Sequence, residues 1–157
     1  MIKTTSIPRS KLPIFSKEEM DLIYNQDELS KFIDLPFDIA NFEKQIEKKE
    51  KFFSHEQRLI LANTLEENYK AVPRKKQALA QIKLLKEKNT YTVTTGHQLC
   101  LYGGPLYFFL KIIHTIRLSE VLKEHYPGYN FIPIFWMASE DHDSDEINSL
   151  HLFGKTI

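Results

Sequence analysis

Cysteine is almost absent from this sequence of 157 residues, which contains only Cys100. A single thiol excludes a disulfide within the chain and favours a reducing compartment, so we expect a cytoplasmic protein. An apolar N-terminal segment of the length that a secretory signal needs is absent too. The longest apolar-rich stretch, residues 106–116, is interrupted by Lys111 and His114 and is too short to span a bilayer. We therefore expect no membrane partner.

Net charge is also absent, because Lys+Arg and Asp+Glu number 21 each. A neutral chain lacks the basic surface with which proteins contact nucleic-acid phosphates, so we predict no nucleic-acid partner. Hydrophobic residues make up 42% of the chain and charged residues 27%, which are the proportions of an ordinary globular domain. The chain is long enough for one domain with a hydrophobic core.

Glycine is missing from residues 1–88, which are rich in Lys and Glu and predict a mainly helical N-terminal segment. Ser16 and Glu19 have the spacing of a capping box that begins a short helix toward Tyr24. Apolar residues at helical spacing, among them Ala62 and Leu65, predict an amphipathic helix further on. This amphipathic helix is predicted over residues 54–70. Two further helices are predicted over residues 38–53 and 73–88.

The character of the sequence changes at residue 89, where we place the start of a Rossmann-like core domain over residues 89–157. Residues 90–94 are β-branched or aromatic and predict a strand. Pro105 precedes a predicted helix over residues 106–125, and the apolar run 131–137 predicts a second strand. Together they form one right-handed βαβ unit. The fold class is therefore α/β, with a helical segment followed by the first βαβ unit of an incomplete, Rossmann-like parallel sheet.

Apolar composition also predicts where these elements are buried. The helix over residues 106–125 is apolar around most of its circumference, which predicts burial against more than one partner. The run 131–137 is apolar on both faces and predicts an interior strand. We interpret Trp136 and the aromatic residues 107–109 as core. Cys100 is interpreted as a small, partly buried side chain rather than a nucleophile.

A first polar motif, residues 95–98 with the sequence TGHQ, follows the first predicted strand. Gly103, Gly104 and Pro105 then lead into the predicted helix. Backbone N–H groups of such a loop, together with the N-terminus of the helix, favour an anion such as phosphate. The spacing matches neither the dinucleotide fingerprint nor the P-loop. A structural loop without a ligand is the alternative.

A second polar motif, residues 140–143 with the sequence EDHD, follows the second predicted strand. Carboxylates beside an imidazole can transfer protons, orient the histidine or hold Mg²⁺. Zinc fits less well because nitrogen and sulfur ligands are too few, and we assign no metal ligand. An acidic helix start capped by Ser139 is the alternative. The carboxyl ends of neighbouring parallel strands meet at one edge, so the two motifs predict one crevice.

The two segments together resemble a known family. TGHQLCLYGGPLYFFLKI and IPIFWMASEDHDSDEIN are similar in content, order and separation to the bacillithiol-biosynthesis cysteine-adding enzymes, the cysteine ligases of low-GC Gram-positive bacteria and Bacteroidetes. The paired patterns TG(H/Q)Q…GPLY and FW(I/M)AxEDHD carry the resemblance, which covers about residues 90–154. The chain departs from the pattern at Gly103, Cys100 and Ser144, where Thr, Asn or Gly, and Phe are usual.

The resemblance implies a Rossmann-type core with a coiled-coil arm for homodimerisation, in proteins several times longer than this chain. It also implies small-molecule substrates: the carboxyl group of cysteine is joined to the amine of glucosaminyl-malate in an amide (C–N) ligation. ATP or ADP is the cofactor associated with the fold. The implied catalytic residues are His142, Asp141 and His97. The implied cofactor-binding residues are Thr95, Gly96, Gln98 and Gly104, and the implied substrate-binding residues are Glu140 and Asp143.

Two alternatives to a ligase stay open. The glycine loop would also suit a nucleotide- or sugar-binding module without catalysis. A chain with one βαβ unit could also be an inactive truncated product. We expect this N-terminal portion to be inactive alone, because the strands that would close the pocket around His142 would lie beyond Ile157.

Overall fold

The computed structural model describes residues 5–100, 103–140, 148–149 and 151–157. They form two compact units, the first up to Lys48 and the second from Lys49 to Ile157. The predicted division at residue 88 rested on composition, whereas this division rests on contacts, and the predicted boundary stays a prediction. Each unit is described by itself.

The N-terminal unit consists of short helices. α1 (Lys17–Tyr24) begins at the predicted capping box, in which Glu19 N donates to Ser16 Oγ at 3.1 Å and Ser16 N donates to Glu19 Oε2 at 2.7 Å. α2 spans Phe42–Glu50 and continues into the second unit. The remaining elements are single turns of 3-10 helix: η1 (Arg9–Lys11), η2 (Gln26–Leu29) and η3 (Ile39–Asn41).

Two helices of the second unit confirm the predictions for residues 54–88. α3 (His55–Asn68) is capped by Ser54, and α4 spans Lys76–Leu84. The predicted apolar stripe is buried at Ala62, which is 0% exposed. α4 begins three residues after the predicted Pro73, because Arg74 has a φ of 55° and cannot belong to a right-handed helix.

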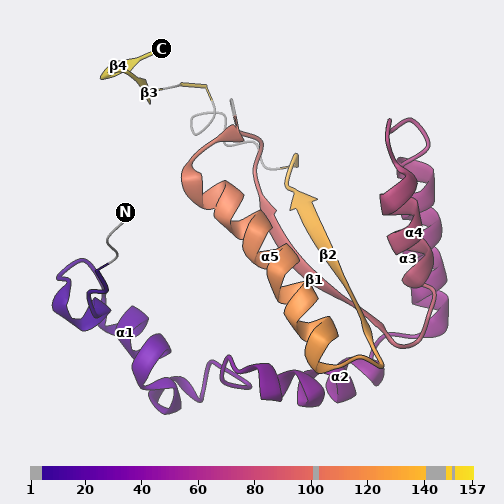
Figure 1. The fold of residues 1–157 in the computed structure, drawn as a ribbon, viewed down its shortest axis with the longest axis horizontal. Coiled ribbons are helices and arrows are strands. Elements are labelled where there is room, and N and C mark those ends of the chain that lie inside the picture. Colours follow the sequence, from indigo (N-terminus) through magenta and orange to yellow (C-terminus); the bar gives the residue numbers. More distant parts are fainter. Residues whose placement is uncertain (1–4, 101–102, 141–147, 150) are drawn as a thin grey trace. The chain divides into compact units, whose positions relative to one another are not determined.

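The predicted βαβ unit is confirmed (Figure 1). β1 (Thr90–His97) leads through the glycine loop to α5 (Leu106–His125), and β2 (Asn130–Met137) follows. The strands pair in parallel, from Thr90 opposite Asn130 to His97 opposite Met137. Because the pairing runs to the last residue of both strands, their carboxyl ends lie side by side.

Helices cover both faces of this strand pair. Ile132 and Ile134 of β2 pack with residues of α3 and with residues in and just after α4. Phe135, the next residue along β2, contacts Phe108 of α5, with ring centroids 5.4 Å apart. Successive side chains of a strand point to opposite faces. α3 and α4 therefore lie on one face and α5 on the other.

The expected burial of α5 against more than one partner is wrong for the described residues, in which its main contacts are with the strand pair of β1 and β2. The helix buries Thr115, Ser119 and Leu122 instead. The two hydroxyl groups are satisfied within the helix, because Thr115 Oγ1 donates to Lys111 O at 2.8 Å and Ser119 Oγ donates to Thr115 O at 2.9 Å. Five apolar residues of the helix are between 42% and 74% exposed: Leu106, Phe109, Leu110, Ile113 and Ile116.

The prediction that the second strand is interior is also wrong for the described residues, where β2 pairs with β1 alone. Asn130 N donates to Asn89 O at 2.9 Å and Ala138 N donates to His97 O at 3.1 Å. The N–H groups of even-numbered residues in β2 therefore face β1. Pro133 is odd-numbered, so its missing N–H falls on the open edge, where it removes no bond to β1.

A buried arginine joins α3 to the start of β1. Arg58 is 3% exposed, and its Nη1 donates to Thr90 O at 2.7 Å. The guanidinium carbon also lies 5.7 Å from the ring centroid of Tyr91. The Tyr91 hydroxyl donates to Glu50 Oε1 at 3.2 Å. Burial, and then this bond to a carboxylate, raise the pKa of Tyr91 to about 12.

A short hairpin follows the second motif and was not expected from the sequence. β3 (His151–Leu152) pairs antiparallel with β4 (Lys155–Thr156). Phe153 and Gly154 form the turn with φ values of 49° and 76°, the positive pair that a tight hairpin turn requires.

Among the helices that the structure describes, none has the length and apolar character of a membrane span.

Gly96 is required where the two strands approach. A Cβ at this position would lie 2.9 Å from Trp136 O and 3.1 Å from Trp136 Cβ. Because one of these atoms is backbone, the strands would have to separate. We expect Gly96→Ala to lower the free energy of unfolding by about 1–3 kcal/mol, measured by chemical denaturation. Gly128→Ala is the matched control, since nothing lies within 4 Å of its Cβ. Equal losses in both variants would contradict this account.

The pKa of Tyr91 makes stability depend on pH. Its value of about 12 in the folded chain lies above the ordinary 10.0, so the folded state holds the phenolic proton more tightly. This contribution is complete below pH 10 and is lost as the pH rises toward 12. We expect Tyr91→Phe to lose less stability than the wild type over this range in urea unfolding, while Tyr24→Phe, at an exposed tyrosine, follows the wild type. Parallel pH curves for wild type and Tyr91→Phe would refute the assignment.

Candidate functional site

The first predicted motif lies at the carboxyl end of the strand pair, where Gly96 and His97 face Trp136 and Met137. Glu140 of the second motif is exposed and follows β2 by three residues. The proposed catalytic and substrate-binding residues Asp141, His142 and Asp143 lie outside the described residues. The structure therefore defines the β1 side of the predicted crevice, and the first residue of the β2 side.

His97 is held by hydrogen bonds at both ring nitrogens. Nδ1 lies 3.0 Å from Gln98 O, and Nε2 lies 2.8 Å from the Tyr107 hydroxyl. A carbonyl oxygen only accepts, so Nδ1 carries the hydrogen of the neutral ring. Nε2 is then the free base and accepts from Tyr107. The ring also meets Phe108 edge to face, with centroids 5.6 Å apart.

Tyr107, in the first turn of α5, was interpreted as core from the sequence, but 53% of it is exposed. Its hydroxyl donates to His97, and the oxygen can still accept a hydrogen bond. Sequence reasoning missed this residue because an aromatic in an apolar run resembles packing. The one available signal was its position, since the first turn of a helix that follows a parallel strand faces the strand ends.

Cys100 packs between His97 and the glycine loop. Its Sγ lies 3.3 Å from His97 Nδ1 and 3.6 Å from Gln98 O. The expectation that Cys100 is partly buried is confirmed. A Cβ on Gly104 would lie 2.8 Å from this sulfur, and Gly104 has a φ of 67°. Packing and backbone conformation thus explain this glycine without a ligand, and its assigned cofactor role stays a prediction.

A lysine of α5 reaches the same end of β1. Lys111 Nζ donates to the carbonyl of Gly96, and the side chain is half-buried. The sequence indicated only that Lys111 interrupts an apolar stretch. Its contact with the TGHQ motif places an ammonium group beside the strand end.

The start of α5 is suited to an anion. Pro105 is the N-cap and provides no side-chain hydrogen bond to the first turn. Uncapped N–H groups at a helix N-terminus attract negative charge. Thr95, assigned to the cofactor from the sequence, is half-buried at the end of β1. The donors therefore fit a phosphate or carboxylate.

Trp136 was predicted to belong to the core, and this prediction is wrong. It is 59% exposed, and its indole Nε1 donates to Glu140 Oε1 at 3.1 Å. Trp136 shares a sheet face with Ile134, but it lies beyond the part of that face where α3 and α4 form the core. The apolar pattern identified the strand but could not indicate where its covering helices end.

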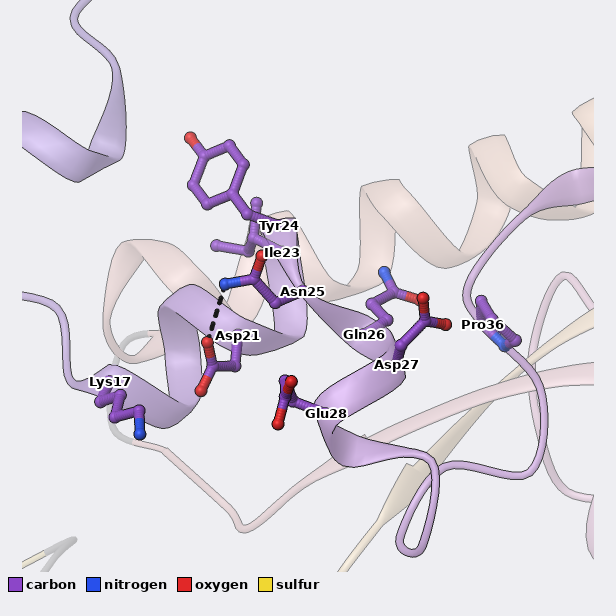
Figure 2. Close-up of a pocket in the computed structure, with 9 residues that line it drawn as sticks. All are labelled: Lys17, Asp21, Ile23, Tyr24, Asn25, Gln26, Asp27, Glu28 and Pro36. Carbon is purple, nitrogen blue, oxygen red and sulfur yellow. Dashed lines mark hydrogen bonds between the residues drawn. The ribbon is translucent and has the colours of Figure 1, made fainter.

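Metal ligands are not assembled in the part of the chain that the structure describes, where no three His, Cys, Asp or Glu side chains group as a possible metal site. A pocket of about 850 Å³ lies in the N-terminal unit, around the end of α1 and the start of η2 (Figure 2). Asp21, on its wall, accepts from Asn25 Nδ2 at 2.9 Å. None of the described residues assigned to the site from the sequence lines this pocket.

A parallel βαβ unit with helices on both faces and polar motifs at its strand ends defines a Rossmann-like α/β domain. The chain matches, over residues 2–157, the family described as bacillithiol biosynthesis BshC, N-terminal Rossmann-like domain. It belongs to this family, as the two sequence motifs indicated.

Several relatives bear the name "Putative cysteine ligase BshC". The protein from Flavobacterium johnsoniae is 45% identical over 90% of this chain and 27% of its own length. The protein from Christiangramia forsetii is 44% identical over 97% of this chain and 28% of its own length. The protein from Natranaerobius thermophilus is 36% identical over 86% of this chain and 25% of its own length. The chain thus spans about a quarter of these relatives.

The hydrogen bonds of His97 predict its tautomer. We expect the neutral ring to carry its hydrogen on Nδ1, which long-range proton–nitrogen NMR correlation distinguishes from the Nε2 form. Tyr107→Phe removes the donor to Nε2 and should move the Nε2 resonance, whereas Phe109→Leu, on the same helix, should not. A neutral His97 protonated on Nε2 would refute this arrangement.

Proposed function

We propose that the chain is the N-terminal part of a ligase that joins the carboxyl group of cysteine to the amine of glucosaminyl-malate in bacillithiol biosynthesis. One observation carries the proposal: in a chain of this family, the imidazole of His97 and the partly exposed hydroxyl of Tyr107 are hydrogen-bonded to each other at the carboxyl end of β1. Ligands of open α/β sheets bind at this edge. The names of the relatives support the reaction class.

Amide formation needs an amine that is held in place and then loses a proton. The Tyr107 hydroxyl directs its hydrogen to His97, so its oxygen can accept from the N–H of the amine. We assign the orientation of the amine to His97 and Tyr107. His142 follows β2 in the sequence and has the chemistry of a general base. We propose that His142 takes the proton that the amine loses. We propose that Asp141 orients the imidazole of His142.

The carboxyl group of cysteine must also be activated. A bound ATP or ADP would supply this chemistry by transferring its terminal phosphoryl group to the carboxylate, and phosphate would leave when the amine attacks. The uncapped start of α5, the Lys111 ammonium and the TGHQ backbone are the groups that would hold a phosphate. Thr95 and Gln98 would add polar contacts to that cofactor. Full-length homodimers, as the family resemblance implies, would supply the rest of the pocket.

Substitutions in the full-length enzyme test these roles. We expect His142→Ala to abolish bacillithiol formation without loss of folding, as measured by mass spectrometry and thermal melting. His97→Ala should lower kcat by about 10²-fold or more, whereas His97→Gln should retain most activity because an amide oxygen can accept from Tyr107. His125→Ala, at the exposed end of α5, is the control.

Unchanged turnover in His142→Ala would refute the assignment of His142 as the general base. A His97→Gln variant as impaired as His97→Ala would mean that His97 itself transfers the proton. Thermal melting adds a separate test of the alternatives: stabilisation by ATP alone, in an enzyme that forms no product, would favour a binding module without catalysis.

A further inference from the structure

An exposed indole lies at the strand end that the proposed ligase site shares. Trp136 is 59% exposed, although tryptophan usually buries most of its surface. It occupies the next-to-last position of β2, opposite Gly96 of the TGHQ motif. An exposed large aromatic beside a candidate site is a common feature of ligand-binding surfaces.

The indole is fixed on two sides. Its Nε1 donates to Glu140 Oε1 at 3.1 Å. Its Cβ and Cδ1 would lie 3.1 Å and 3.5 Å from a Cβ built on Gly96, so the ring begins directly above that glycine. A ring held in this way loses little freedom when a ligand binds, which favours affinity.

The chemistry of this pair selects a cation. The face of an indole attracts an ammonium group, and a carboxylate only accepts hydrogen bonds. Glu140 uses one oxygen for Trp136 and has a second that can accept from a ligand. The same carboxylate would repel the phosphates of a nucleotide. An ammonium-bearing small molecule therefore fits, and a nucleotide does not.

We propose that Trp136 and Glu140 bind the amino sugar of glucosaminyl-malate in its protonated form, with the ammonium group against the indole face and the Glu140 carboxylate. This inference rests on the proposed function and adds the residues that recognise the amine substrate. Trp136 and Glu140 receive the ammonium group when the substrate first binds. Once the amine has lost its proton, Tyr107 holds it as proposed above. The uncapped start of α5 and Lys111 are left for the anion.

Binding to the full-length enzyme tests the proposal. Calorimetry with glucosaminyl-malate, without nucleotide, should give a Kd roughly tenfold higher for Trp136→Leu and a smaller rise for Trp136→Phe, which keeps an aromatic face. The KM for cysteine should stay unchanged. Phe52→Leu, at another exposed aromatic of the same unit, is the matched control and should bind as the wild type does.

The charge of the ligand gives a second test. The wild type should bind glucosaminyl-malate more tightly than its N-acetyl derivative, which has no ammonium group, and Glu140→Gln should reduce this preference. Equal affinities of wild type, Trp136→Leu and Glu140→Gln for glucosaminyl-malate would overturn the proposal while leaving the ligase intact. A wild type that neither binds glucosaminyl-malate nor forms product would instead refute the proposed function on which it rests.

Discussion

The parallel pairing of β1 and β2 is the constraint on which the rest of the second unit depends. It ends with His97 opposite Met137, so residues far apart in the sequence reach the same edge. The pairing is possible at that end because Gly96 has no side chain to meet the backbone of Trp136. α5 reinforces it with Lys111, which contacts the Gly96 carbonyl, and Arg58 does the same for Thr90 at the other end.

The strand ends bring two kinds of polar group together. On the face that α5 covers, His97 and Tyr107 offer an imidazole and a hydroxyl that are hydrogen-bonded to each other. On the other face, Trp136 offers an aromatic surface, and its indole donates to the carboxylate of Glu140. The proposed ligation would use both kinds, because one proposed substrate brings an amine and the other would react through a carboxyl group that has to be activated. The separation of His97 from Trp136 follows from the alternation of side chains along the two paired strands.

Local signals in the sequence predicted the elements well, because caps, turns and alternation act over a few residues. The capping box at Ser16, the limits of α5 and the βαβ order are examples. Burial was predicted less well because it depends on partners. α5 buries Thr115 and Ser119 and exposes leucine and isoleucine, and Trp136 is exposed although it belongs to an apolar strand. Arg58, by contrast, is buried because a backbone carbonyl and aromatic rings receive it. Among the residues of the candidate site, His97 could be predicted from its motif. Tyr107 and Lys111 could be identified only from the packing of α5 on the strands.

The central claim is that the amine substrate binds at the carboxyl end of the strand pair. The most direct measurement is a crystal structure of the full-length enzyme with glucosaminyl-malate. We expect the amino group within hydrogen-bonding distance of the Glu140 carboxylate in its protonated form, or of the Tyr107 hydroxyl in its neutral form, with the sugar beside Trp136. Glucosaminyl-malate bound elsewhere, with these side chains remote from it, would contradict the account.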